Sequence, residues 1–356
     1  MPEEGTTGLV CSRPDVFVGG EEKPQLTAGL ISLLISENTS GLYRCEARFG
    51  NWGSIHNTSD YLYFDRRTLD FGKDFQIKLS DKTLFEGKIM GLEANYPEGQ
   101  APQISVLAED RFQDLRMTRR TRTFAGVTDS DVFNQIANDH GLSPSVSVTG
   151  PDYKVLAQVN QSDLAFLRER ARAIDAELWM DGSTLNARTH SDRNGGSLKL
   201  SRGNQLREFK VLADLALQRT SVSVNGWDVS SKSGLQFEAT ESAISSELNG
   251  DSSGASILKS ALGQRKEALV HTVPLNSKEA QAVAESFFKM SARRFLVGRG
   301  VAQTTASLRV GAKVELQNLG PLFNGKYYIT EVKHIFDGTK GLRTEFCAER
   351  PGIGQN

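Results

Sequence analysis

The segment FQIKLSDKTLFEGKIM, residues 75–90, decides the fold class. From Phe75 to Leu79 it alternates apolar and polar side chains, a period of two that is typical of a strand with one buried face. The polar residues 80–82 predict a turn, and a second strand-like run follows from Leu84 to Met90. The segment therefore predicts an antiparallel pair of strands.

Similar short strands lie on both sides of this pair. Residues 30–35 form an apolar run, and residues 103–107 close a series that begins near Leu26. The series contains turn residues but no long helical pattern, which favours an antiparallel barrel or sandwich. Closure into a barrel would remove the exposed edges of such strands. We therefore expect an antiparallel barrel or sandwich in the N-terminal third.

Three later segments predict helices. The first begins near Asp129 or Ser130 and ends at Gly141, and the second begins at Ser162. The third opens at Asn276-Ser277, and its apolar residues recur at the i, i+3, i+4, i+7 spacing of a helix with one buried face. Strand patterns resume in the segments 177–180, 217–224, 313–316, 326–335 and 342–348. The sequence thus predicts an α+β protein that is mainly β.

The charges are balanced overall but unevenly distributed. The chain of 356 residues has 42 basic and 43 acidic side chains and a net charge of −1. Residues 1–110 hold 17 acidic and 10 basic side chains, whereas residues 111–210 and 211–356 each carry a balance of +3. Near-neutrality argues against a dedicated nucleic-acid binder. The gradient bears on how copies associate and orient.

Several compositional features exclude other classes. Cys11, Cys45 and Cys347 are an odd, widely spaced set, which disfavours a disulfide framework or a zinc site. The N-terminus lacks a basic and apolar leader, and the longest apolar stretch, residues 28–35, is too short to cross a membrane. We expect synthesis in the cytoplasm without a signal peptide and without membrane insertion. Residues 1–24 predict an extension that orders against a partner, and the Ser-rich residues 240–256 predict a mobile loop.

One string fits a catalytic motif. Residues 250–254, Gly-Asp-Ser-Ser-Gly, match G-x-S-x-G and make Ser252 a candidate nucleophile. The polar, Ser-rich flanks favour a flexible loop instead. Gly298–Gly300 and Gly325-Lys326 lack the pattern of a phosphate loop and predict turns, and the five histidines show no metal-ligand spacing. We predict no catalytic residue, no cofactor and no metal ligand.

The densest charge feature is a run of four arginines: Arg116, Arg119, Arg120 and Arg122. Contact with nucleic acid is one interpretation, but only Phe112 and Phe124 flank the run and the chain is neutral. A solvated face or a salt-bridge site between subunits fits better. These arginines are the candidate inter-subunit interface.

The chain resembles the phage late control gene D protein family. The segments that carry the resemblance are Phe85–Ile89, Asp110–Phe112, Thr121–Phe124, Thr128–Val132, Gln158–Ala173 and Phe323–Val332. The segment Gln161–Arg168, QSDLAFLR, is similar to that family's hallmark helix entry. The resemblance spans about residues 25–350, and its specificity lies in the shared order of the segments.

The resemblance implies the central baseplate hub of a contractile tail or injection particle, and so a place in a phage tail or a phage tail-like particle: a virion, or an extracellular or cytoplasmic injection particle. It implies a homotrimer in which each chain supplies two tube-protein-like antiparallel β-barrels with helical insertions, giving a pseudo-sixfold ring that joins a hexameric tube to a trimeric spike. Because the chain stops soon after its last strand, the expected partners are a separate trimeric spike protein, a tail tube or tube-initiator protein, and baseplate wedge components. The alternatives are a type VI secretion spike component and a particle-borne serine hydrolase.

By analogy with this family we assign the following parts. They are an N-terminal extension (1–24), a first barrel (25–118, completed by 206–240), an α/β segment of the second barrel (119–205), a Ser/Gly-rich linker region (241–276), a helix with C-terminal strands that complete the second barrel (277–350), and a tail (351–356).

Overall fold

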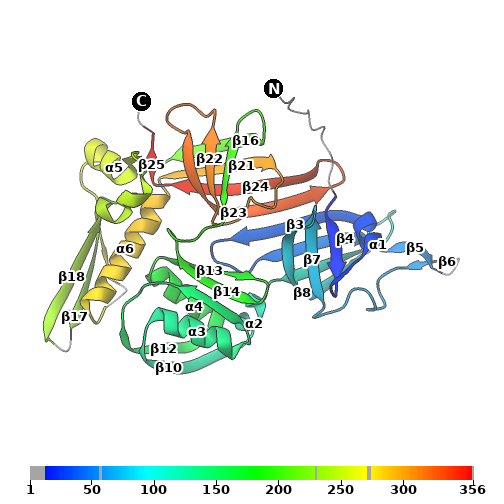
Figure 1. Ribbon diagram of the computed structural model, residues 1–356, viewed down its shortest axis with the longest axis horizontal. Coiled ribbons are helices and arrows are strands. Elements are labelled where there is room, and N and C mark those ends of the chain that lie inside the picture. The colour runs from blue at the N-terminus through cyan, green and yellow to red at the C-terminus, as the bar shows by residue number, and fades with distance from the viewer. Residues whose placement is uncertain (1–12, 56–57, 229–230, 271–273, 355–356) are drawn as a thin grey trace.

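The computed structural model describes residues 13–55, 58–228, 231–270 and 274–354 (Figure 1). Within them, hydrophobic side chains gather into four cores, and the elements fall into four sets by the core that holds most of their buried side chains. We call these sets the first β unit, the α/β unit, the flank unit and the second β unit. Figure 1 shows the two β units side by side, the α/β unit below them and the flank unit at the end away from the first β unit.

The first β unit contains the pair of strands that the sequence predicts, since β7 and β8 pair antiparallel. Its elements are β1 (Asp15–Val18), β2 (Glu21–Glu22), α1 (Pro24–Gly29), β3 (Leu30–Asn38), β4 (Arg44–Gly50), β5 (Trp52–Ile55), β6 (Thr58–Tyr61), β7 (Asp74–Leu79), β8 (Lys82–Asn95) and β9 (Gln103–Glu109). Their alternate residues, such as Phe75 and Ile77, are buried in one core. Residues 15–18 pair with β7, so this part of the expected extension is an ordered strand of the unit.

The second β unit is built from two distant parts of the chain. Its elements are β15 (Ser197–Ser201), β16 (Leu206–Ala213), β21 (Leu296–Gln303), β22 (Lys313–Gln317), β23 (Gly325–Asp337), β24 (Gly341–Arg350) and β25 (Gly352–Ile353). The segment Gly298–Gly300 was expected to be a turn but lies inside β21. Glycine is needed at both positions because the rings of Phe209 and Phe346 leave no space there for a side chain.

The two β units share a single sheet. The sheet has 13 strands, and its main order is β16-β21-β24-β23-β3-β4-β9-β8-β7-β1-β2, with β22 paired to both β23 and β15. The units meet where β3 and β23 pair antiparallel, residues 32–38 against residues 331–337. We call this pairing the seam. The mainly β, antiparallel fold class is therefore confirmed, and Phe336 of β23 and Leu342 of β24 join the core of the first β unit beside the seam.

The expected completion of the first barrel by residues 206–240 is wrong. Strand β16 pairs with β21 in the second β unit, where the ring of Phe209 contacts those of Tyr327 and Phe346. The neighbour that the first β unit acquires is β23, across the seam. Because β16 carries only a short alternating pattern, its sequence fits either sheet and tertiary packing decides.

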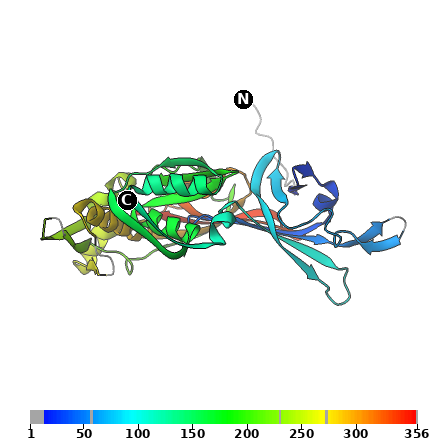
Figure 2. The same ribbon diagram turned by 90° about the horizontal axis from the view of Figure 1, so that it is seen from below.

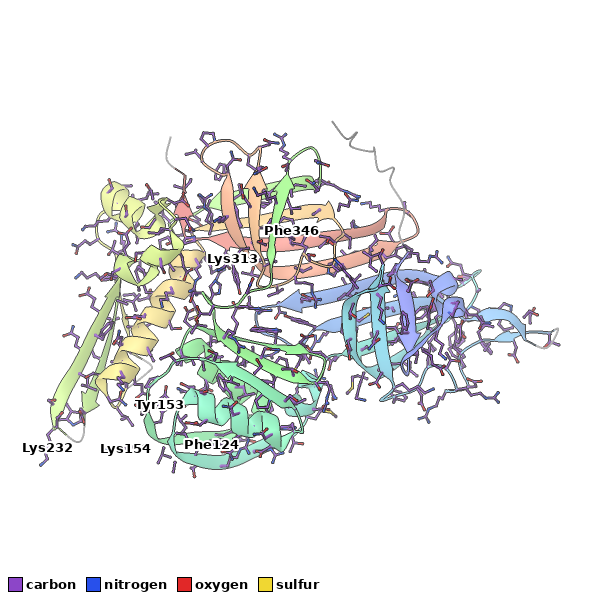
Figure 3. All side chains as sticks on the ribbon, in the orientation of Figure 1. Phe124, Tyr153, Lys154, Lys232, Lys313 and Phe346 are labelled. Carbon is purple, nitrogen blue, oxygen red and sulfur yellow. The ribbon has the colours of Figure 1, made fainter. Side chains whose placement is uncertain are left out.

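The α/β unit is more independent than expected. Its elements are α2 (Phe112–Arg116), β10 (Arg119–Val127), α3 (Asp129–Asp139), β11 (Ser143–Ser147), β12 (Tyr153–Ser162), α4 (Asp163–Ala173), β13 (Ala176–Asp181) and β14 (Thr184–Thr189). Of the expected barrel segment 119–205, only 197–201 pairs with the C-terminal strands. The rest of this segment has a core of its own, in which the rings of Phe124 and Phe166 stack with centroids 5.7 Å apart (Figure 3 labels Phe124).

The caps of the predicted helices explain where they begin. Ser162 caps α4 by accepting from the backbone N–H of Ala165, as its position predicts. The first predicted helix begins one residue earlier than expected, because Thr128 and Asp131 form a capping box at the start of α3.

The flank unit replaces the expected linker. Its elements are β17 (Ser221–Asp228), β18 (Ser233–Thr240), the 3-10 helix η1 (Glu241–Glu247), β19 (Ser252–Ser253), α5 (Gly254–Leu262), β20 (Lys266–Leu269) and α6 (Ser277–Arg293), whose cap Asn276 agrees with the sequence. Ile244 and Ala255 are buried between the serines that suggested a mobile loop. Seen from below, β17 and β18 project at the end of the molecule opposite the β5–β6 hairpin (Figure 2).

Candidate functional site

A buried ion cluster joins three of the units. The carboxylate of Glu177, on β13, lies 2.8 Å from Nδ1 of His190 and 2.8 Å from Nη1 of Arg193. The hydroxyl of Tyr328, on β23, donates to the same carboxylate at 2.7 Å. Arg193 also donates to the hydroxyl of Tyr43 in the segment before β4, at 2.9 Å. The cluster therefore fixes the α/β unit against both β units.

The electrostatics of this cluster favour its charged form. Burial alone would raise the pKa of Glu177, but its contacts with His190 and Arg193 lower it to about 2. Burial raises the pKa of Tyr43 to about 12, and Arg193 opposes that rise. The cluster is therefore a structural ion pair at neutral pH. Removing one partner would leave an unpaired buried charge.

A second buried ion pair attaches the flank unit. Arg293, in the last turn of α6, lies 2.7 Å from the carboxylate of Asp175 and 2.6 Å from that of Glu247. Asp175 follows α4, and Glu247 ends η1. Burial by itself lowers the pKa of Arg293, but the two carboxylates raise it above its usual value. Three elements thus share one guanidinium.

A carboxyl group beside the first β unit has the opposite behaviour. Asp110 accepts hydrogen bonds from the backbone N–H groups of Tyr43 at 2.8 Å and Phe112 at 3.0 Å. Burial raises the pKa of Asp110 to about 7, because these N–H groups compensate only part of the desolvation. Arg168 binds the same loop through the carbonyls of Ser40 and Gly41.

A cleft of about 560 Å³ opens between the units and is lined by residues of all four. Its walls carry both signs of charge, since Arg172, Arg219 and Arg294 line it together with Glu267 and Glu349, and Arg219 pairs with Glu267 at 2.6 Å. Burial raises the pKa of Glu349. The cleft lies over the two ion clusters and belongs to the junction that they hold together.

The predicted arginine run lies on α2 and β10, and the structure gives each member an acceptor within the chain. Arg116 pairs with Glu109, Arg119 donates to the carbonyl of Asn160, Arg120 lies 3.1 Å from Asp163, and Arg122 pairs with Asp139 and Asp163 at 2.8 Å. Arg116 and Arg120 remain about 40% exposed. The inter-subunit role of this run stays a prediction.

Asp163 is the centre of this arginine network. It is the first residue of α4, and besides the arginines it is 2.8 Å from Nε2 of His140 and accepts from Gln158 at 2.8 Å. Burial by itself would raise the pKa of Asp163, but these hydrogen bonds and the arginines hold it below its usual value. The hallmark helix entry is thus the point where α4 is tied to β10 and α3.

The candidate nucleophile Ser252 lies in a short strand, not in a flexible loop. Ser252 pairs with Ile353 across β19 and β25, and α5 begins two residues later. The neighbouring Ser253 caps α5 and donates to Glu241. The serines of this segment therefore have structural positions, and the expectation of a mobile loop is wrong.

Histidine and cysteine positions complete the predicted chemistry. His334 lies at the seam, where its Nδ1 is 2.8 Å from the hydroxyl of Thr344. Burial lowers the pKa of His334 to about 3. Cys45 and Cys347 are free thiols, and Cys11, His56 and His271 lie outside the described residues. Within residues 13–354 as described, no group of His, Cys, Asp and Glu is arranged to hold a metal ion.

Exposed aromatic rings gather at the far end of the first β unit. Trp52 and Tyr61, on the β5–β6 hairpin, contact each other edge to face with centroids 5.3 Å apart, and Tyr61 stacks on Phe64 at 5.0 Å. Tyr96, which follows β8, contacts Phe64 at 5.9 Å. Trp52 is 46% and Tyr96 63% exposed. We call these four residues the aromatic tip, and such exposed clusters are typical of protein–protein contact sites.

The sequence did not reveal the buried clusters or the aromatic tip. A charged residue inside the apolar run of β13 was the available signal for Glu177. Its partners His190 and Arg193 follow within 16 residues, but Tyr328 lies 151 residues away, and only the fold brings the three together. In the part of the chain that the structure describes, no helix is long and apolar enough to span a membrane.

The architecture is that of phage tail proteins. The 43 kDa tail protein of prophage MuSo2 from Shewanella oneidensis aligns with a TM-score of 0.70 at 12% identity, over 96% of this chain and 98% of that one. A tail protein from Neisseria meningitidis MC58 aligns with a TM-score of 0.65 at 12% identity, over 96% and 97% of the two chains. An Escherichia coli component of the type VI secretion system aligns with a TM-score of 0.59 at 12% identity, over 96% and 79%.

The sequence also matches a family. A family model described as the Alg8 N-terminal domain matches residues 56–337, and the chain belongs to this family. No match is found among the curated proteins. The likeness to tail proteins agrees with the fold that the resemblance to late control gene D proteins implies.

Proposed function

We propose that this protein is the structural hub of the baseplate of a contractile tail or injection particle. The observation that carries the proposal is the alignment over nearly the whole length of both chains with prophage tail proteins, two β units included. In the proposed assembly, three copies place six β units in a ring that seats a hexameric tube on one side and a separate trimeric spike on the other. Tube-initiator and wedge proteins would contact its rim.

The internal construction of the chain supports a structural role. The buried charged residues Glu177, Arg193 and Arg293 serve junctions between units, and their ion pairs are closed. The seam makes the two β units one sheet, so their relative position is set by backbone hydrogen bonds. A ring that carries load requires units held in fixed positions, and an enzymatic role has no support in these contacts.

The experiment is assembly of the purified chain, measured by mass photometry alone and with candidate spike and tube-initiator chains from the same gene cluster. We expect a trimer that binds both. A chain that stays monomeric and ignores both partners would refute the hub function.

A second candidate function is a spike component of a type VI secretion system. The alignment with the Escherichia coli component favours it, although this chain covers 79% of that one. A gene cluster that encodes a separate spike supports the hub, whereas a cluster without one supports the spike component.

A further inference from the structure

The two β units carry opposite charge. Residues 15–109, the first β unit, hold 14 acidic and 9 basic side chains, a balance of −5. Residues 197–213 and 296–353, the second β unit, hold 12 basic and 6 acidic side chains, a balance of +6. The opposite charges of the units would attract each other between copies, and like units would repel.

Part of the positive charge of the second β unit lies on the last two strands of the sheet. Strand β16 is the last in the strand order, and Lys210 of β16 lies directly opposite Arg299 of β21. Both are exposed, as is Arg207, and among the described residues no carboxylate lies within ion-pair distance of any of the three. Like charges directly opposite each other are unfavourable in a sheet, and Glu208, Glu331 and Glu345 line the same surface hollow as Lys210 and Arg299 without pairing with them. We call these three residues the basic edge; Glu208 is the one acidic side chain of the strand.

Two acidic side chains of the first β unit lie close in sequence to Tyr96 of the aromatic tip. Glu93 lies near the end of β8, and Glu98 lies in the turn that joins β8 to β9, on either side of Tyr96. Both carboxylates are exposed, and neither has an ion-pair partner in the described part of the chain. The tip therefore combines aromatic area, which supplies contact energy, with acidic groups, which supply orientation.

The tip cannot reach the basic edge of its own chain. In the strand order, β8 is seven positions from β16, which corresponds to about 34 Å along the sheet at 4.8 Å per strand. Figure 1 shows the β5–β6 hairpin at one extreme of the long axis, pointing away from the second β unit. Contact between the two surfaces therefore requires a second copy.

We propose that the acidic aromatic tip of one copy docks on the basic edge of the next. The contact joins different surfaces, so it is head to tail and can close into a ring, whereas a two-fold contact would place like charges together. This inference rests on the proposed hub function and names the contact that closes its ring.

The test is charge reversal in the full chain, with the assembly constant measured by sedimentation at 50 and 500 mM NaCl. We expect K210E/R299E to weaken the trimer at least about tenfold at 50 mM NaCl and to remove most of its salt dependence. E93K/E98K should weaken it similarly, and the chain with all four substitutions should recover. The matched control is K259E/R265E, which changes the net charge by the same amount on exposed residues of the flank unit.

The outcomes separate the inference from the function. The contact would be overturned if K210E/R299E formed the trimer as well as the wild type does. It would also be overturned if the variant with all four substitutions did not regain the trimer. Either result would leave the hub function standing. A wild-type chain that remains monomeric with its spike and tube initiator would overturn the hub function itself. Unchanged unfolding by urea shows that a variant retains its fold.

Discussion

The two β units share one sheet but differ in how their charged side chains are used. In the first β unit, surface ion pairs form between near neighbours, such as Arg66 with Asp70 at 2.7 Å, and the buried Glu37 of β3 pairs with Arg309 of the second β unit beside the seam. In the second β unit, charged and polar side chains reach other units, as when Nε of Arg350 donates to Asp251 of the flank unit at 2.8 Å. The difference teaches that the second β unit anchors the rest of the chain, whereas the far end of the first is free for outward contacts.

The largest expected loss of stability comes from removing one charge of the buried ion cluster that joins the units. Arg193→Met should lower the free energy of unfolding by about 3–5 kcal/mol, because it leaves the buried carboxylate of Glu177 without its guanidinium. Urea unfolding measures the loss. Lys199→Met, which removes an exposed pair with Glu315, is the control and should unfold like the wild type. Equal effects of the two substitutions would contradict the comparison.

The glycines of β21 should show the next largest effect. A Cβ at Gly300 would lie 2.4 Å from Cζ of Phe346, so Gly300→Ala should cost about 1–3 kcal/mol of unfolding free energy by overpacking. Gly234→Ala in β18, where a Cβ meets nothing within 4 Å, is the control and should cost nothing. A tolerated Gly300→Ala would show that the core of the second β unit is looser than the contacts indicate.

The seam should make stability depend on pH. The pKa of His334 is about 3 in the fold, against 6.5 for an ordinary histidine, so the unfolded chain binds the extra proton between these values. The contribution of neutral His334 to the free energy of unfolding is therefore intact above pH 6.5. It is lost as the pH falls toward 3, at up to about 1.4 kcal/mol per pH unit. His334→Gln should be less stable than the wild type at pH 7.5 and approach or exceed it at pH 4.5. Parallel pH profiles in urea unfolding would exclude this role.

The smallest effect on stability is expected at the aromatic tip. Trp52→Ala removes an exposed edge-to-face contact with Tyr61 and should cost no more than about 0.5–1.5 kcal/mol of unfolding free energy. Its effect on the trimer should be larger than that of Phe71→Ala, an exposed ring of the same unit outside the tip. Thermal unfolding and mass photometry on both variants make the comparison. If Trp52→Ala lowered the stability of the fold but left the trimer unchanged, the prediction would be wrong.

Local patterns predicted much of the fold. The period of two in residues 75–79, the cap at Ser162 and the spacing after Asn276 each depend on neighbours within a few residues, and the structure agrees with them. The hallmark helix entry proved informative for the same reason, since Asp163 begins α4.

What the sequence could not predict depends on distant packing. The partner of β16 is chosen by the rings of Tyr327 and Phe346, more than 100 residues away. Residues 240–256 suggested a loop because serine is common there, yet Ile244 is buried and Ser253 caps a helix. The arginine run predicted an exposed site, whereas Asp163, hidden in the helix pattern, receives two of its members.

The seam has a mechanical consequence. Seven residue pairs join β3 to β23, and on its other edge each strand pairs with a strand of its own unit, β4 or β24. A pull along these strands loads all the hydrogen bonds of the seam in shear at once, while a pull across them would open the bonds one after another. The molecule is therefore stiffest along the strand direction, and strain imposed on one β unit in that direction passes to the other without a hinge.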